Sequence, residues 1–524
     1  MRPPSRFAAP RSQAPVLTLV LAGLSGLALL ATPVAAVDTC QELKWEDLQP
    51  PYVGPGHRGS LLEPAAVAQL GLSASGINLA AWLPLGDFPG SNTRGSDIWG
   101  YVAPSGREYA IIGFDLGTGF VEITDPINPE IVGYIASPGT LWKEITTIDQ
   151  VAYIVADDIG EGMQVVDLSA IDSGVVTLVD TITDNGLATV HTIRGNEASE
   201  WIYLNGSNLG GGGLLPYNAS NPLDPTPGPS IWTTSYVHDA VITTYTAGPY
   251  AGREIAFICG GFNGLYIVDV TNKAAMSTLS HLMYPNVTYC HYGWLSDDKK
   301  HFFIGDEIDE LAGAVTTSTT YVIDVQNLSL PLFVTSFTNG NTAIDHNPVG
   351  IGSYFLTANY RSGLRIFDWS NLGAVQEVAW FDTYPADDEP EFNGAWGVHR
   401  MPSGVVLVSD MERGLFVFDV SPTVQVDQPS TPPTTTRLLP LEPNPFRAQT
   451  NVTFTLAKAD RVKIDLVDVL GRRLLQLQDR EYAVGRHVAP LDLSQGAREI
   501  PAGTYWVVLR TSDGEQRQRA VVVR

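Results

Sequence analysis

Cysteine is scarce in this sequence of 524 residues. It has three cysteines, Cys40, Cys259 and Cys290, which excludes a small scaffold stapled by many disulfides and a cysteine-rich zinc module. Cys259 and Cys290 would pair if neighbouring segments brought them together, and three unpaired thiols are the alternative. A chain of this length can bury a sizeable core without such staples.

Basic residues are also few, with 31 Lys and Arg against 56 Asp and Glu and a formal net charge of −25. The imbalance is uneven, because residues 437–524 hold 14 basic and 10 acidic residues, which leaves 17 against 46 in the remainder. An acidic body repels nucleic acid and anionic lipid. We therefore expect no nucleic-acid partner.

Common catalytic signatures are absent from the sequence. It contains no HExxH motif, no GxSxG motif and no phosphate-binding loop, and the glycine run 210–213 lacks the lysine that phosphate binding requires. The sequence therefore identifies no chemical reaction.

Only one long apolar run occurs, from Val16 to Leu30, and it is shorter than the ~20 residues that a membrane span needs. Arginines precede it, and the small residues Val34-Ala35-Ala36 follow it. This pattern predicts a signal peptide over residues 1–36, with an uncleaved anchor as the alternative. We expect a secreted or outer cell-surface protein with no transmembrane segment after signal removal.

Glycine and proline are plentiful, at 50 and 36 residues, and one phrase repeats through the middle of the chain. Its clearest copies are GMQVVDL, GLYIVDV, GLRIFDW and GLFVFDV, starting at Gly162, Gly264, Gly363 and Gly414, and weaker copies start at 117, 213 and 319. The copies are 44 to 55 residues apart, which fits a four-stranded propeller blade. The sequence therefore predicts an all-β chain with a seven-bladed β-propeller over residues 74–420.

The two ends of this repeated region predict how the ring closes. No outer strand follows Val420, but residues 79–83 (LAAWL) are similar to the expected outer strand of the sixth blade, residues 377–381 (EVAWF). We expect the N-terminal segment to complete the last blade and so to remove an open edge. Residues 37–73 are then an N-terminal extension.

The repeats resemble the choice-of-anchor B family, which is built from LVIVD repeats. The resemblance covers Asn78 to Val420 and includes the segments SDIWGY, LWKEI, YVHDA, YCHYGWLSDD, GDEIDE, AIDHN, NYRSGLRIFD and SDMERGLFVFD, which begin at residues 96, 141, 236, 289, 305, 343, 359 and 409. The resemblance implies an exported or cell-surface protein and no known reaction.

A second domain is expected after a Pro/Thr-rich linker over residues 421–436. Residues 437–524 carry alternating strand patterns that suit a small immunoglobulin-like β-sandwich. The segments PNPF, LVDVLGRR and IPAGTY, beginning at 443, 466 and 500, resemble the C-terminal sorting domain of type IX secretion. The resemblance implies the type IX secretion machinery as a partner, and a plain adhesion or stalk module is the alternative.

Aligning the starts of the seven units brings one residue per unit to the axis, and four of these residues are histidines. The full set is Trp99, Trp142, His191, His238, His291, His346 and Trp396. Imidazoles with nearby carboxylates suit a divalent metal ion, so the candidate ligands are His191, His238, His291, His346, Asp239 and Asp345. The candidate ligand-binding residues are Trp99, Trp142, Trp396, Glu144, Arg361 and Arg413.

The loops after the second strands add acidic residues on the same face, and these suit either a calcium site or a solvated acidic surface. They are Asp157, Asp158, Asp306, Glu307, Asp309, Glu310, Asp410 and Glu412. The histidines and carboxylates are also explained by hydrogen bonds that pin turns.

Two functions remain open from the sequence. The first is a binding or interaction module that presents one loop-rich face to an extracellular protein, glycan or small ligand. The second is a metal-dependent enzyme, a hydrolase or lyase, with a histidine-lined site at the mouth of the channel.

Overall fold

The computed structural model describes residues 48–158, 160–424, 436–439, 441, 444–468, 471–482, 485–493 and 500–523. The predicted signal peptide, Cys40 and most of the predicted linker lie outside these residues. Within them the only helices are one α-helical turn and five 3-10 turns: α2 (Pro64–Val67), η1 (Ala68–Leu70), η2 (Leu85–Asp87), η3 (Ile171–Ser173), η4 (Asp184–Gly186) and η5 (Gly248–Tyr250). None of the helices in the described residues has the length and apolar character of a membrane span.

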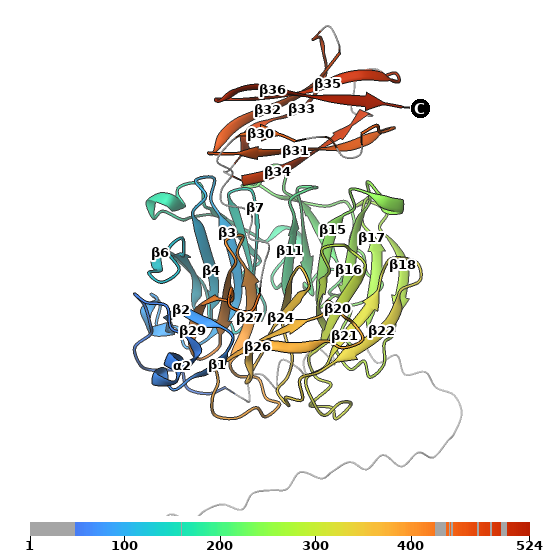
Figure 1. Ribbon diagram of the computed structural model, residues 1–524. Coiled ribbons are helices and arrows are strands. Elements are labelled where there is room, and N and C mark those ends of the chain that lie inside the picture. Colours follow the sequence, from blue (N-terminus) through green and yellow to red (C-terminus); the bar gives the residue numbers. More distant parts are fainter. Residues whose placement is uncertain are drawn as a thin grey trace, which may run out of the picture. The chain divides into compact units, whose positions relative to one another are not determined.

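Residues 73–419 form seven antiparallel sheets (Figure 1). The first sheet contains β3 (Gly95–Val102), β4 (Glu108–Phe114), β5 (Gly117–Glu122) and β6 (Glu130–Ala136). The second contains β7 (Lys143–Ile148), β8 (Val151–Ala156), β9 (Met163–Asp167) and β10 (Thr177–Ile182). The third contains β11 (Thr192–Asn196), β12 (Trp201–Asn205), β13 (Leu215–Asn218) and β14 (Thr226–Pro227). The fourth sheet contains β15 (Asp239–Thr244), β16 (Glu254–Cys259), β17 (Leu265–Asp269) and β18 (Ser277–Leu282). The fifth contains β19 (Cys290–Leu295), β20 (His301–Asp306), β21 (Thr320–Asp324) and β22 (Leu332–Phe337).

The last two sheets each take one strand from the beginning of the chain. The sixth sheet contains β23 (Pro348–Ile351), β24 (Tyr354–Asn359), β25 (Gly363–Asp368) and β26 (Gln376–Asp382), with β1 (Ser73–Ser75) as its fifth strand. The seventh contains β27 (Ala395–Arg400), β28 (Val405–Asp410) and β29 (Gly414–Asp419), with β2 (Asn78–Leu83) as its fourth strand. In the seventh sheet β2 pairs with β29, and Trp82 lies opposite Phe416. The predicted completion of the last unit by the N-terminal segment is therefore confirmed.

The first strands of successive sheets contact one another in a closed circle. The contacts run from β3 through β7, β11, β15, β19, β23 and β27, and β27 returns to β3. Each hydrophobic core lies between two neighbouring sheets; between the fourth and fifth, for example, Phe257 and Phe302 stack with ring centres 5.2 Å apart. A closed circle of four-stranded sheets is the architecture of a β-propeller.

The repeated phrase has a local physical explanation. Its aspartate, or asparagine in the third sheet, accepts a hydrogen bond from the backbone two residues further on, as Asp269 does from the amide of Thr271 at 3.0 Å. This Asx turn ends the third strand. In the four clearest copies the glycine has a positive φ, 69° at Gly264, and a Cβ there would lie 2.6 Å from the carbonyl oxygen of Leu282. Only glycine fits such a position.

The C-terminal residues form two further sheets with a core of their own. One sheet contains β30 (Arg437–Leu438), β31 (Gln449–Leu456) and β34 (Gly485–Asp492), and the other contains β33 (Arg473–Tyr482), β32 (Asp460–Val467), β35 (Gly503–Thr511) and β36 (Gly514–Val522). Both sheets contribute to this core, in which Phe454 and Val507 are fully buried.

Candidate functional site

Four histidines meet at the end of the propeller where the innermost strands begin. His191 and His238 come directly before β11 and β15, His346 comes two residues before β23, and His291 is the second residue of β19. A β-bulge between Cys290 and Tyr292 takes His291 out of the strand register. All four side chains line the same cavity and are at least nine-tenths buried. The structure thus brings together the four predicted histidines.

Hydrogen bonds fix the orientation of three of these imidazoles. His238 Nδ1 lies 2.8 Å from the carbonyl oxygen of His291, and His346 Nδ1 lies 2.5 Å from that of Trp396. A carbonyl oxygen only accepts, so each Nδ1 carries the proton and Nε2 is the basic nitrogen. His191 Nδ1 lies 2.8 Å from a carboxylate oxygen of Asp157 in the same way. In each of these three imidazoles Nδ1 is therefore taken up by a hydrogen bond to an acceptor, which leaves Nε2 as the nitrogen available to a ligand.

The Nε2 atoms of His191 and His238 lie 2.8 Å apart. Two basic nitrogens repel each other at this distance unless a proton or a cation lies between them. The next ring centres along the row are 4.1 Å apart for His238 and His291 and 4.4 Å apart for His291 and His346. The four rings therefore form one continuous row across four sheets.

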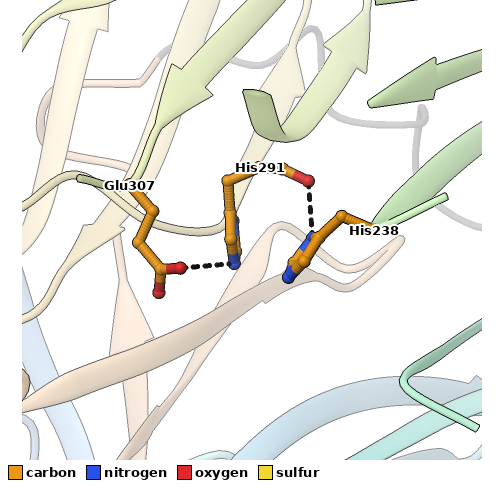
Figure 2. Close-up of side chains that lie close together, drawn as sticks. All are labelled: His238, His291 and Glu307. Carbon is orange, nitrogen blue, oxygen red and sulfur yellow. Dashed lines mark hydrogen bonds and ion pairs between the residues drawn. The ribbon is translucent and has the colours of Figure 1, made fainter. Parts of the chain in front are cut away.

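Glu307 is the carboxylate at the far end of this row (Figure 2). Its Oε2 lies 3.4 Å from His291 Nε2, and its Oε1 lies 3.4 Å from His346 Nε2. Tyr360 donates a hydrogen bond of 2.8 Å to Oε1 and fixes the carboxylate. His238, His291 and Glu307 present ligand atoms that all lie within 4.8 Å of one another. In the sequence Glu307 belongs to an acidic loop, and nothing there predicts that it joins the histidines.

The cavity that these residues line is small. Trp142 and Trp396 also line it, as predicted, and each is at most 4% exposed. The space that a water molecule could occupy is about 20 Å³. A single water or ion needs about 10–15 Å³, so this space holds one ion or water and excludes a sugar stacked on the tryptophans.

Glu144 and Asp239 line the same cavity but are held by a buried arginine. Arg194 Nη1 lies 2.6 Å from Glu144, and Nη2 lies 2.6 Å from Asp239. Burial raises the pKa of Glu144 well above its ordinary value, and the Asp97 charge adds to this effect. Burial likewise raises the pKa of Asp97 to about 7. Glu144 and Asp239 are thus held in ion pairs with Arg194, at the wall of the cavity.

Asp345 belongs to a different group of carboxylates. Although it is next to His346 in the chain, it lies with Asp309 and Glu310, where ligand atoms of the three approach within 4.8 Å. The structure therefore separates Asp345 from the four predicted histidines.

Trp99 is not part of the histidine row. It lies opposite Ile111 in β4, the register that His399 occupies opposite Leu407 in β28. Its indole donates a hydrogen bond of 3.0 Å to Thr147 and packs on His399 with ring centres 4.9 Å apart. A bulge between Gly95 and Ile98 displaces the alignment of the first unit.

Arg361 and Arg413 do not line this cavity either. Arg361 forms ion pairs with Asp387 and Glu391 and so holds the loop before β27. The guanidinium of Arg413 lies over the rings of Tyr52 and Trp82, at 5.1 and 5.7 Å from their centres. Arg413 lines a separate cleft.

The remaining cysteines are both buried free thiols at neighbouring sheets. Cys259 ends β16, Cys290 begins β19, and the two lie in one hydrophobic core. Burial raises the pKa of the Cys259 thiol well above its ordinary value, and contact with Cys290 adds to this.

Sequence comparisons give no match, either to a protein-family model or to a curated protein. Solved structures give distant likenesses. A functionally unknown protein from Desulfotomaculum acetoxidans is 13% identical, with a TM-score of 0.42 over 58% of this chain and 89% of its own. The WD40 β-propeller domain of Doa1 is 13% identical, with a TM-score of 0.43 over 67% of this chain and 100% of that chain. A protein from Lactobacillus plantarum is 14% identical, with a TM-score of 0.41 over 72% of this chain and 95% of its own.

The class of this protein follows from its own strand order. Its sheets close into a circle around a row of buried histidines, which defines a β-propeller with a polar cluster at one end of its axis.

Proposed function

We propose that this β-propeller binds one divalent transition-metal ion in the histidine row, where His238, His291 and Glu307 present ligand atoms within 4.8 Å of one another and His191 and His346 lie beside them. The observation that carries the proposal is the 2.8 Å separation of the Nε2 atoms of His191 and His238, whose Nδ1 atoms both face hydrogen-bond acceptors. Metal-ligating histidines characteristically donate their other ring N–H to a carboxylate or a backbone carbonyl.

The geometry also supports a class of ion. Two nitrogens 2.8 Å apart that each lie about 2.1 Å from one ion subtend about 85° at it. This angle suits octahedral or tetragonal coordination, as in Ni(II) or Cu(II), better than tetrahedral zinc. The cavity of about 20 Å³ suits a bare ion. We therefore propose ion binding rather than the hydrolase or lyase chemistry that the sequence left open.

The seven sheets are, in this proposal, the blades of one closed ring, and the ring acts outside the cell. The support is the signal-like segment at residues 1–36 and the sequence resemblance of residues 437–524 to a type IX sorting domain. The two C-terminal sheets are taken as an immunoglobulin-like sandwich that engages the secretion machinery. Mass determination of protein exported by a type IX-competent bacterium tests this part, with cleavage after Ala36 as the expected result.

Elemental analysis of the full chain, purified without chelator, tests metal binding. We expect about one transition-metal ion per chain, and we expect it to be lost in the His238→Ala/His291→Ala double variant. His281→Ala is the matched control, because His281 is exposed on β18 and should leave the metal content unchanged. A chain that stays metal-free after incubation with Mn, Fe, Ni, Cu and Zn ions, with unchanged melting temperature, would contradict the proposal.

A further inference from the structure

A second cluster of ligand atoms lies outside the histidine row and is made only of carboxylates. Asp309 and Glu310 are in the loop between β20 and β21, and Asp345 is in the loop before β23, so the cluster joins two neighbouring sheets. The three side chains present oxygens within 4.8 Å of one another. Their exposed fractions are 0% for Asp309, 8% for Glu310 and 2% for Asp345.

The carboxylate oxygens of this cluster receive few hydrogen bonds from the rest of the protein. No N–H or hydroxyl group from another part of the chain donates a hydrogen bond to either carboxylate oxygen of Glu310, which lies beside the Asp309 carboxyl, and none donates to Oδ1 of Asp309 or Oδ1 of Asp345. Asp309 accepts one hydrogen bond, of 2.8 Å, from Tyr321 through its other oxygen. Buried carboxylates without a partner are costly, because burial removes the water that would otherwise solvate the charge.

Other buried carboxylates of this propeller, in contrast, have hydrogen-bond donors or a basic side chain as partners. Asp306, three residues before Asp309, accepts hydrogen bonds from Tyr284 and from two backbone amides. Glu254 pairs with Lys273. Among the described residues, no lysine or arginine forms an ion pair with Asp309, Glu310 or Asp345. The cluster therefore has no basic side chain as a partner among the described residues, which leaves its oxygens available to a cation.

The backbone also makes room for this arrangement. A Cβ at Gly305 in β20 would lie 2.9 Å from Oδ2 of Asp345, so only glycine lets that carboxylate come this close to the strand. Burial, with the charges of Asp345 and Asp309, raises the pKa of Glu310 to about 12. The protein holds three carboxyl groups together against their mutual repulsion.

We propose that Asp309, Glu310 and Asp345 bind a divalent oxygen-preferring cation, and that this cation is Ca²⁺. Oxygen-only ligands select hard cations, and the unpartnered pair of oxygens on Glu310 offers the bidentate contact that Ca²⁺ accepts. Two further unpartnered oxygens come from Asp309 and Asp345, and water completes a shell of six to eight ligands. The site uses other residues than the transition-metal site and does not depend on it.

Calcium binding by the purified full chain tests this site. After removal of metals with a chelator, isothermal titration with Ca²⁺ should detect binding, and the melting temperature should rise with Ca²⁺. Glu310→Gln should weaken this binding by about tenfold or more, since it removes the ligand with two unpartnered oxygens. Without Ca²⁺ this variant should melt at about the wild-type temperature, because burial raises the pKa of Glu310 to about 12 and its carboxyl is already uncharged there. Glu130→Gln on exposed β6 is the matched control and should bind as the wild type does.

The outcomes separate this proposal from the transition-metal proposal. The His238→Ala/His291→Ala variant should keep its Ca²⁺ binding, and Glu310→Gln should keep its transition metal. If Glu310→Gln does not fold, Asp345→Asn is measured in its place, together with competition of Ca²⁺ against Tb³⁺ luminescence sensitised by Tyr321 in the wild type. Absence of Ca²⁺ binding to the wild type, or equal Ca²⁺ binding by the wild type and the ligand variant, would overturn the site. Tighter binding of Mg²⁺ than of Ca²⁺ would overturn its assignment to calcium.

Discussion

Arg194 in β11 and Asp239 in the neighbouring sheet form an ion pair, with Nη2 of the arginine 2.6 Å from Oδ2 of the aspartate. The same guanidinium reaches Glu144 in a third sheet, so one buried cation joins three consecutive sheets directly behind the histidine cavity. Burial by itself lowers the pKa of Arg194, but the surrounding carboxylates, Asp239 first, raise it on balance. The arginine therefore stays charged in the interior.

Replacing Arg194 should be strongly destabilising. Arg194→Met leaves the carboxylates of Glu144 and Asp239 buried without their cation, which costs about 3–5 kcal/mol in the free energy of unfolding. Chemical denaturation measures this change. The control is Arg253→Met, which breaks an ion pair whose arginine is 48% exposed and should cost less than about 1 kcal/mol. Equal effects of the two substitutions would show that the buried network contributes little.

Closure of the ring by β2 should depend on Trp82. This side chain is fully buried, stacks on Phe416 with ring centres 5.2 Å apart, and donates its indole N–H to the carbonyl of Arg413 at 2.8 Å. We expect Trp82→Ala to lower the free energy of unfolding by about 3–5 kcal/mol. Leu332→Ala, at a side chain 56% exposed on β22, is the control and should change stability by less than about 0.5 kcal/mol. A Trp82→Ala protein that melts with the control would argue against closure by this strand.

The stability of the propeller should fall in mild acid through His399. Burial, with the nearby charges of Arg194 and Arg400, lowers the pKa of His399 to about 4 from an ordinary value of 6.5. The unfolded chain therefore takes up a proton that the folded one does not, and stability is lost as the pH falls from 6.5 towards 4. This loss is about 3 kcal/mol.

Unfolding curves for the wild type and His399→Gln, recorded in chelator at pH 7 and pH 4, measure this contribution. The difference in stability between the two proteins should shift in favour of the wild type on going from pH 4 to pH 7. Parallel pH profiles would contradict the assignment.

The two described cysteines should resist thiol reagents in the native state. Cys259 and Cys290 are at most 1% exposed, and burial raises the pKa of Cys259, so the reactive thiolate is both rare and shielded. We expect alkylation of both only after denaturation, as measured by peptide mass mapping. Rapid labelling of either one in folded protein would be inconsistent with this core.

Much of the fold could be predicted from the sequence because its signals are local. The glycine before the third strand and the aspartate after it act through turns within two or three residues, so they recur visibly in the chain, as at Gly264 and Asp269. Similarity between residues 79–83 and 377–381 was enough to place β2 beside β29.

The site was less predictable because its residues meet only through the strand register, which sets the position of each side chain along its strand. The four histidines each lie at the start of an innermost strand, and counting from strand starts found them. Trp99 was misplaced because a bulge near Gly95 changes that count, and a bulge leaves no mark in one sequence. The contacts of Glu307 and Arg194 depend on which neighbouring sheet each side chain faces, and a single sequence does not show this. The same holds for Asp345, which joins a different cluster from its neighbour His346.

The pairing of Asn78 with Asp419, 341 positions apart, also dictates an order of events during biosynthesis. A ribosome adds about 5–20 residues per second, so β2 emerges roughly twenty seconds to a minute before its partner strand exists. Until then the growing chain carries an unpaired strand, and an open strand edge is prone to pair with other chains. Translation of the final repeat is consequently the step that commits the nascent polypeptide to its native topology.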